Sequence, residues 1–301
     1  MSKMLKPCKK RKNDYIGYLM VLPAFVLFVA FVLLPAILTF RMSFYDWDLF
    51  SPEMKFVGWN NFVKLFDNEQ FTTVLGNTVY FTIVTVLSKV VLGVLLASLV
   101  ATYVKGKVGK FIMESSVFMP IVIPMSVVAL VFNKLYDTEF GALNGIIIAL
   151  GGNPVGWLTD SNVALNSVMI VDIFKGVGFF FIVSLVAIRN VPRVYYEAAE
   201  IDGASKFYQF RKITLPLIGN TVVFLFITAF ISSFQIFDPI YVMLNGMFGD
   251  TKITISYMLW QQAFFYRDVG FAAVIAIVIF VIVMIMTLIQ LLLSKVLVYN
   301  E

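Results

Sequence analysis

The 301-residue sequence contains no histidine and a single cysteine, Cys8. Without histidine, no imidazole can act as a general base or as a metal ligand. One cysteine excludes an intrachain disulfide and a cysteine-based metal cluster. The carboxylates are scattered rather than clustered. The sequence therefore argues against an enzyme, and we expect no catalytic residue and no metal site.

Charge is scarce as well. Asp, Glu, Lys and Arg make up 14% of the residues, against about 25% in soluble globular domains. Hydrophobic residues make up 60%, and the mean hydropathy is +0.90. The net charge of +5 suggests a nucleic-acid partner, but its distribution argues against one. Basic residues crowd the N-terminus, as in a membrane-topology signal: Lys3, Lys6, Lys9, Lys10, Arg11 and Lys12.

Six apolar runs are long enough to cross about 30 Å of hydrocarbon, which takes about 20 helical residues. They cover residues 16–40, 75–102, 111–132, 163–188, 217–241 and 270–294. The first run is too long for a signal-peptide core and lacks a small-residue cleavage site, so we interpret it as a retained anchor. Basic residues gather in the tail 1–15 and in the loops 103–110 and 189–215, which predicts that these segments and both termini are cytoplasmic. We expect one all-α membrane domain over residues 1–301, with six transmembrane helices.

The polar loop 189–215 carries more local structure than a linker needs. Residues 195–202 favour a short helix, and Gly203 suits the left-handed residue that ends one. Ser205 can cap a second helix. A helix this short is marginal alone, so packing must hold it. Composition leaves two readings open, an ordinary linker and a docking surface for a soluble partner.

Charged and polar residues inside the spans form the second signal. Asp172 and Lys175 are spaced i, i+3 on one helix face, and we expect them to pair. Such groups at mid-membrane are costly and should face a cavity or a partner. The predicted substrate-pathway residues are Asp172, Lys175, Gly176, Phe179, Ser232, Ser233, Gln235 and Ile236. The alternative is hydrogen bonding between helices. For Lys89 we expect helix packing or snorkelling, and Glu114 has no evident role.

The string EAAEIDGAS at residues 197–205, with Thr-Leu-Pro at 214–216, resembles the signature loop of membrane subunits of bacterial ABC importers. The chain is most similar to the carbohydrate-uptake branch, which includes maltose and glycerol-phosphate permeases. Segments that carry this likeness are residues 59–62, 141–144 and 234–238. One departure is Leu-Asn-Gly-Met at 244–247, where the family often has Thr-Gly-Gly-Pro.

This resemblance implies a permease subunit in a bacterial cell membrane, forming half of a translocation pathway. The implied partners are a second homologous permease, two ATP-binding subunits, an extracytoplasmic solute-binding protein, a carbohydrate and membrane lipid. It also implies a coupling helix that contacts the ATPase through Glu197, Ala198, Ala199, Asp202 and Gly203. The chain has no phosphate-binding loop of the type G-x-x-x-x-G-K-[ST]. We therefore expect no cofactor on this chain, with ATP and Mg on the partner ATPase.

Two questions about transport remain open from the sequence. An Asp172–Lys175 pair would suit an uncharged oligosaccharide, which we favour, whereas a free Lys175 would suit an anion such as a sugar acid or glycerol phosphate. A channel or an ion-coupled secondary carrier would not need the loop at 189–215. A carrier should also contain inverted repeats, and none is evident.

Overall fold

The computed structural model describes residues 14–48, 50–51, 53–245 and 252–298, without the side chains of 14–16 and 294–298. The basic tail at residues 1–13, Gly246 and Met247 therefore lie outside the described residues. The elements are α1 Asp14–Phe28, η1 Val29–Leu33, α2 Leu34–Met42, β1 Tyr45–Asp46, β2 Lys55–Phe56, α3 Asn60–Phe66, α4 Glu69–Tyr103, α5 Lys107–Val122, α6 Met125–Leu135, α7 Ala142–Ala149, α8 Ala164–Arg189, α9 Arg193–Ile201, α10 Lys206–Gln209, η2 Phe210–Thr214, α11 Leu215–Leu217, α12 Gly219–Phe234, α13 Asp238–Leu244, α14 Ile255–Trp260, η3 Gln261–Phe265 and α15 Val269–Val298. The η segments are single π-helical stretches, and β1 and β2 pair antiparallel.

In the described part of the chain, five helical runs are long and apolar enough to cross a membrane: Gly17–Met42, Glu69–Tyr103, Ala164–Arg189, Gly219–Leu244 and Val269–Leu293. A sixth span exists if α5 and α6 are counted together, although they are bent by 99°. The apolar run expected at 111–132 thus consists of two helices with a break between them. Pro124 has no N–H to continue the α5 ladder, and it disfavours a helical conformation at Ile123. Ile123 is accordingly extended, and α6 restarts after Pro124.

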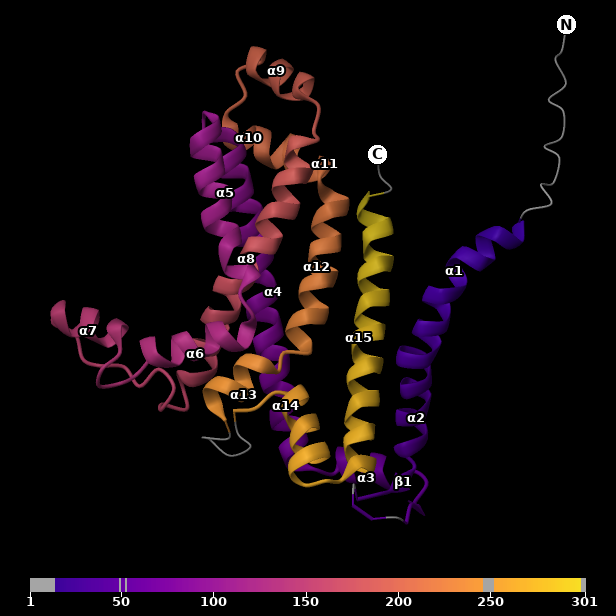
Figure 1. Ribbon diagram of the computed structural model, residues 1–301. Helices are drawn as coiled ribbons and strands as arrows, with labels where there is room; N and C mark the ends of the chain where they lie inside the picture. The colour runs from indigo at the N-terminus through magenta and orange to yellow at the C-terminus, as the bar shows by residue number, and fades with distance from the viewer. Residues whose placement is uncertain (1–13, 49, 52, 246–251, 299–301) are drawn as a thin grey trace, which may run out of the picture.

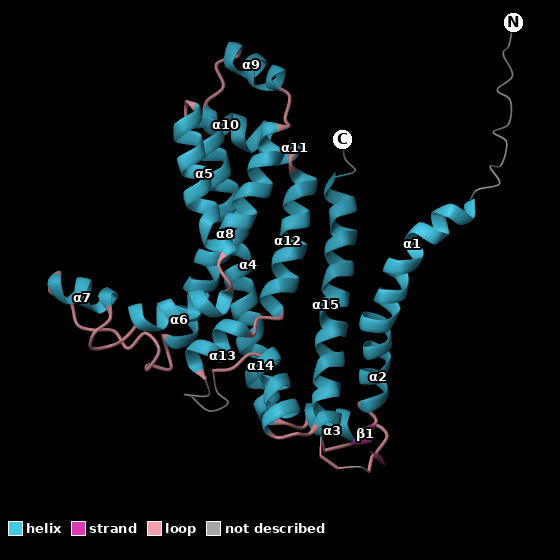
Figure 2. Ribbon diagram, in the orientation of Figure 1, coloured by secondary structure: helices cyan, strands magenta, loops and turns pink. Residues whose placement is uncertain are grey.

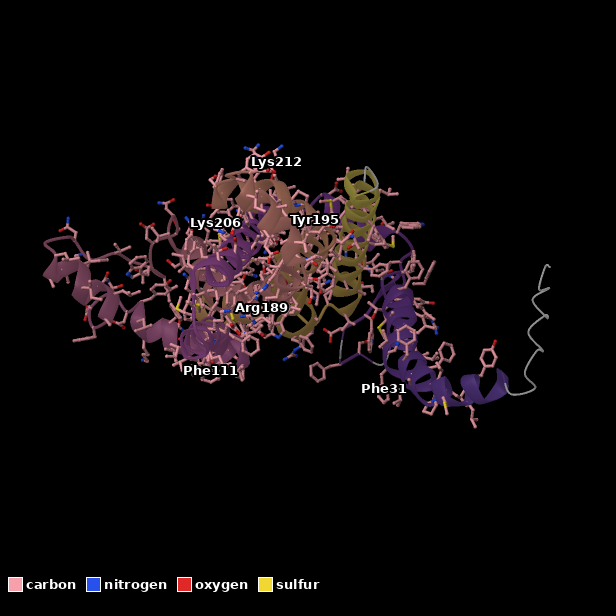
Figure 3. All side chains as sticks on the ribbon, turned by 90° about the horizontal axis from the view of Figure 1, so that it is seen from above. Phe31, Phe111, Arg189, Tyr195, Lys206 and Lys212 are labelled. Carbon is pink, nitrogen blue, oxygen red and sulfur yellow. The ribbon has the colours of Figure 1, made fainter. Side chains whose placement is uncertain are left out.

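The long helices α4, α5, α8, α12 and α15 stand side by side, and the first span leans away from them (Figures 1 and 2). Seen from above, Phe31 of the first span lies apart from the bundle (Figure 3), and its side chain is exposed. The end of α15 lies toward the same end of the bundle as α9 (Figure 1). The segments β1, α7, α13 and α14 lie toward the opposite end.

Glycines allow α8 to sit at the centre of the bundle. A Cβ on Gly93 of α4 would lie 2.5 Å from the Cβ of Phe180 on α8. These two helices are therefore closer than any side chain at position 93 would permit. On another face, a Cβ on Gly178 would lie 2.6 Å from the carbonyl oxygen of Val117 on α5. Close approach through small residues is the common mode of helix association in membranes.

The end of the bundle that carries β1 is fastened by a buried asparagine. Asn61 donates hydrogen bonds through Nδ2 to the carbonyl oxygens of Ser43 and Tyr45, each at 3.0 Å. A Cβ on Gly270, in α15, would lie only 2.0 Å from that Tyr45 oxygen. The segment Trp59–Phe62 thus holds the end of the first span against the start of α15.

Candidate functional site

A cavity of about 530 Å³ lies among α4, α8, α12 and the α5–α6 break, with α13 at its edge. Its lining residues are Lys89, Ile121, Met125, Asp172, Lys175, Gly176, Phe179, Phe180, Thr228, Ser232, Gln235, Ile236, Phe237 and Asp238. Seven of the eight residues predicted to form a pathway line this cavity, and Ser233 does not. Residues that were predicted separately on two spans therefore line one cavity in the structure.

The expected pairing of Asp172 with Lys175 is wrong. Asp172 Oδ2 lies 2.6 Å from Nζ of Lys89 on α4, and both residues are buried, at 7% and 3% exposure. Lys89 Nζ also donates to Ser233 Oγ on α12 at 3.2 Å. Among the described residues, Asp172 Oδ2 accepts no hydrogen bond of normal geometry, so the attraction is between the charges themselves.

Gly176 explains how Lys89 reaches Asp172. A Cβ at Gly176 would lie 2.8 Å from Cε of Lys89 and 3.1 Å from its Cδ. The lysine stem therefore crosses α8 over a position where there is no side chain. A buried charge without a partner is strongly unfavourable, so Lys89 takes the nearest carboxylate, and this explains its presence in an apolar run.

Lys175 is half-buried and faces the cavity. No described carboxylate lies within ion-pair distance of it. The exposed Asp238, in the first turn of α13, lines the same cavity. Asp172 is thus paired with Lys89 of α4, while Lys175, one turn along α8, has no ion-pair partner among the described residues.

Sequence reasoning gave two of these residues no functional role. Lys89 and Asp238 both line the cavity. The sequence signal for Lys89 is a charge within an apolar run, and Asp238 belongs to the family-like segment 234–238. Ser233 is fully buried and bonded to Lys89, so it joins α12 to α4. Ser232 is exposed to the cavity, and its hydroxyl donates to the Ala229 carbonyl at 3.0 Å.

The loop 189–215 forms a short helix on the outside of the bundle (Figure 1). Helix α9 begins after Pro192 and ends at Ile201, within two residues of the predicted bounds. Gly203 has φ +75°, and the Ala204 amide donates to the Ala199 carbonyl at 2.8 Å. This is the closing bond of a left-handed helix terminus, as predicted. Ser205 caps α10 by accepting from the Tyr208 amide, also as predicted.

The predicted docking residues form an open surface on this loop. Glu197, Ala198, Asp202 and Gly203 are exposed, and Ala199 is half-buried. No atom lies within 4 Å of the place where a Cβ of Gly203 would be. A partner surface can therefore approach the backbone here without displacing any described side chain.

Side-chain contacts join α9 and the turn after it to the following segments, α10 and η2. The hydroxyls of Tyr196 and Thr214 are 2.9 Å apart and share a hydrogen bond. Lys206 forms an ion pair with Glu200, and Gln209 Nε2 donates to the Ala204 carbonyl at 3.1 Å. These contacts couple the position of α9 to the helices that follow it.

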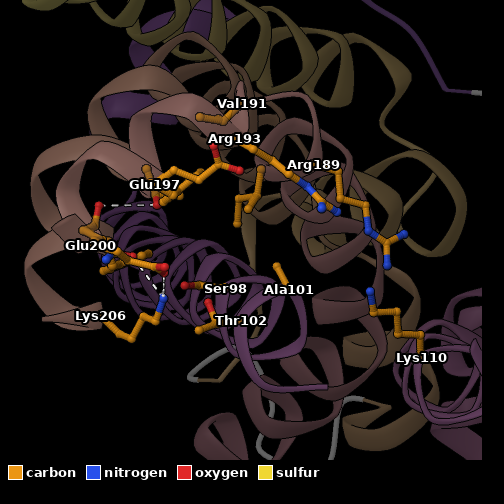
Figure 4. Close-up of a pocket in the computed structure, with 15 residues that line it drawn as sticks. Ser98, Ala101, Thr102, Lys110, Arg189, Val191, Arg193, Glu197, Glu200 and Lys206 are labelled. Atoms are coloured by element: carbon orange, nitrogen blue, oxygen red, sulfur yellow. Dashed lines mark hydrogen bonds and ion pairs between the residues drawn. The ribbon is translucent and has the colours of Figure 1, made fainter. Parts of the chain in front are cut away.

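A polar cavity of about 660 Å³ lies between α9 and the ends of α4, α5 and α8. Figure 4 shows Lys110 and Arg189 on one side of it, and Glu200 and Lys206 opposite. Arg189 is bridged to Glu114 of α5 at 2.5 Å. This ion pair gives Glu114 a structural role, because it joins α5 to the end of α8.

The family described as the binding-protein-dependent transport system inner membrane component matches residues 89–298. The chain belongs to this family. It is therefore a multi-pass membrane permease of the ABC transporter class, and the resemblance inferred from the loop signature is confirmed.

Two relatives match along most of their length. The probable ABC transporter permease protein YurN of Bacillus subtilis is 32% identical over 286 residues, which cover 94% of this permease and 97% of that protein. The trehalose/maltose transport system permease protein MalF of Thermococcus litoralis is 31% identical over 271 residues, 90% of each chain. A chain from the crystal structure of a bacterial ABC transporter that imports the acidic polysaccharide alginate matches with a TM-score of 0.85. Its sequence identity is 25%, and the match covers 94% of this chain and 96% of that one.

Proposed function

We propose that this permease forms half of the translocation pathway of an ATP-driven importer for an oligosaccharide. The observation that carries the proposal is a cavity lined by both polar and apolar side chains within the spans of a chain whose relatives are named for sugars. Among them are the trehalose/maltose permease MalF and an arabinooligosaccharide permease, AraP of Bacillus subtilis. A sugar needs hydroxyl-binding groups and an apolar wall in the same site.

The cavity lining supplies both kinds of surface. Ser232 and Gln235 are exposed to it and can exchange hydrogen bonds with sugar hydroxyls. The rings of Phe179 and Phe237 and the side chain of Ile236 offer apolar contact to a sugar ring. Asp172 lines the cavity while its charge is engaged by Lys89, so in this proposal it shapes the pathway and does not carry a free charge.

In this proposal α9 is the coupling helix. Glu197, Ala198 and Ala199 contact a groove on an ATP-binding subunit, and Asp202 and Gly203 form the turn beside it. Closure of an ATPase dimer would move α9, and the Tyr196–Thr214 contact and the Glu200–Lys206 pair would carry that movement to the spans. This arrangement requires the loop 189–215 and both termini to be cytoplasmic.

The complete transporter would contain a second homologous permease, two ATP-binding subunits and an extracytoplasmic solute-binding protein. The cavity is open on one side, and no residue of the first span, 17–42, is buried within the described chain; both features support a partner permease. ATP and Mg would bind the ATPase, and this chain would hold no cofactor of its own. We treat residues 1–301 as one domain of that assembly.

Reconstitution tests the proposal. The permease is co-produced with a candidate second permease, ATPase and binding protein, placed in proteoliposomes, and assayed for uptake of labelled oligosaccharides. We expect uptake that requires both ATP inside and the binding protein outside. Uptake by this chain alone, driven by an ion gradient, would instead establish a secondary carrier. Active complexes that contain only this permease would replace the heterodimer with a homodimer.

A further inference from the structure

The cavity is lined by a lysine, Lys175, that forms no ion pair with a described carboxylate. We propose that Lys175 binds an oxyanion on the transported molecule, so that the cargo is a carbohydrate with an acidic group, a carboxylate or a phosphate ester. This inference rests on the proposed function and specifies its substrate class.

The carboxylate nearest to Lys175 in sequence is already engaged. Asp172 lies 2.6 Å from Lys89, which also donates to Ser233. These two charges cancel each other, and both residues are almost completely buried. Lys175 is thus left as a cation on the cavity wall, with no ion pair to any described carboxylate.

The depth of Lys175 in the span makes this free charge significant. It lies eleven residues after Ala164 and fourteen before Arg189 on α8, which is about 17 Å and 21 Å of helix at about 1.5 Å per residue. A hydrocarbon layer is about 30 Å thick, so Lys175 lies near its middle, far from both headgroup layers. An intramembrane cation faces a partner or a polar cavity, and here it faces the cavity.

The remaining lining suits a sugar that carries such an anion. Asp238 can accept hydrogen bonds from ring hydroxyls, and Gln235 can both donate and accept. Phe179, one turn after Lys175 on α8, presents an aromatic ring beside it. A lysine–oxyanion contact is stronger than a neutral hydrogen bond, so it would select acidic over neutral sugars.

The test uses matched probes in the complete importer. Digalacturonate is paired with galactobiose, and maltose 6′-phosphate with maltose, so that each pair differs only in its acidic groups. The two acidic probes distinguish a carboxylate from a phosphate ester. Binding-protein-dependent ATPase activity and uptake are measured for the wild type and for Lys175→Gln, Lys175→Arg and Lys107→Gln. Lys107 is exposed and outside both cavities, so its variant is the matched control for loss of one lysine charge.

We expect an acidic probe to be transported in preference to its neutral partner. Lys175→Gln should lower its uptake by about tenfold or more at low probe concentration, the loss expected for a charge-assisted hydrogen bond. Lys175→Arg should retain most uptake, and Lys107→Gln should match the wild type. Basal ATPase activity should stay unchanged in Lys107→Gln.

Four results would overturn the inference. Stimulation by neutral probes alone, or unchanged acidic uptake in Lys175→Gln, would remove the role of Lys175 and leave the carbohydrate importer intact. Loss of the second permease from purified Lys175→Gln complexes would show that the lysine pairs with that subunit. A wild-type complex that no sugar of either kind stimulates would reject the proposed function together with the inference.

Discussion

Because Lys89 is paired with Asp172 and Lys175 is not, we predict that replacing these two lysines of one cavity has different effects on stability. Lys89→Met removes a charge that lies 2.6 Å from Asp172 Oδ2. Lys175→Met removes a charge with no described partner. We expect the first substitution to destabilise the protein strongly and the second to have little effect.

The magnitude follows from the geometry. Two unit charges at 2.6 Å attract by about 6 kcal/mol at an effective dielectric constant of about 20. Most of this attraction offsets the cost of desolvating both groups. Removing one partner leaves the other charge buried alone, which costs about 3–5 kcal/mol. Replacing both groups, as in Lys89→Met with Asp172→Asn, should recover all but about 1 kcal/mol, because no buried charge remains.

The assay is chemical unfolding of the purified protein in one detergent, with the wild type, Lys89→Met, Asp172→Asn, Lys175→Met and the double substitution compared in parallel. The double substitution gives the coupling energy between the two side chains. Equal destabilisation by Lys89→Met and Lys175→Met would refute the assignment of the ion pair. A Lys89→Met chain as stable as the wild type would show that the pair contributes no net stability.

Two further substitutions test the elements around the sites. Gly176→Ala should cost about 1–3 kcal/mol in unfolding measurements, because its Cβ would lie 2.8 Å from Lys89 Cε; in a Lys89→Met background the flexible methionine should reduce this cost. Gly203→Val should abolish sugar-stimulated ATPase activity in the reconstituted complex, since a β-branched residue is strained at φ +75°. Gly203→Asn should retain most activity, because asparagine tolerates the left-handed region. Normal stimulation in Gly203→Val would argue against α9 as the coupling helix.

Hydropathy predicted the positions of the spans because length and apolarity are properties of each run alone. It did not predict the bend at Pro124, since the apolar run continues through both sides of the break. Bend direction depends on which neighbours α5 and α6 pack against. One such contact is Gly178 of α8 against the Val117 carbonyl, which no local pattern specifies.

The loop 189–215 was more predictable than the spans around it. Gly203 ends α9 and Ser205 begins α10, as their residue types require. Both features depend on backbone hydrogen bonds within a few residues, so local sequence contains the necessary information. The ties from α9 to the bundle, such as Tyr196 to Thr214, join residues farther apart, and the sequence pattern did not indicate them.

The partner of Asp172 was the least predictable feature, and the reason is physical. An i, i+3 spacing brings Lys175 near Asp172, but a helix surface pair contributes only about 0.2–0.5 kcal/mol. A buried lysine from another helix is destabilised far more, by about 3–5 kcal/mol, if it has no carboxylate partner. Lys89 reaches Asp172 because Gly176 leaves its path open and Gly93 brings α4 against α8. Competition between two lysines for one carboxylate is thus decided by helix packing, and the lysine without this partner, Lys175, is left on the cavity wall.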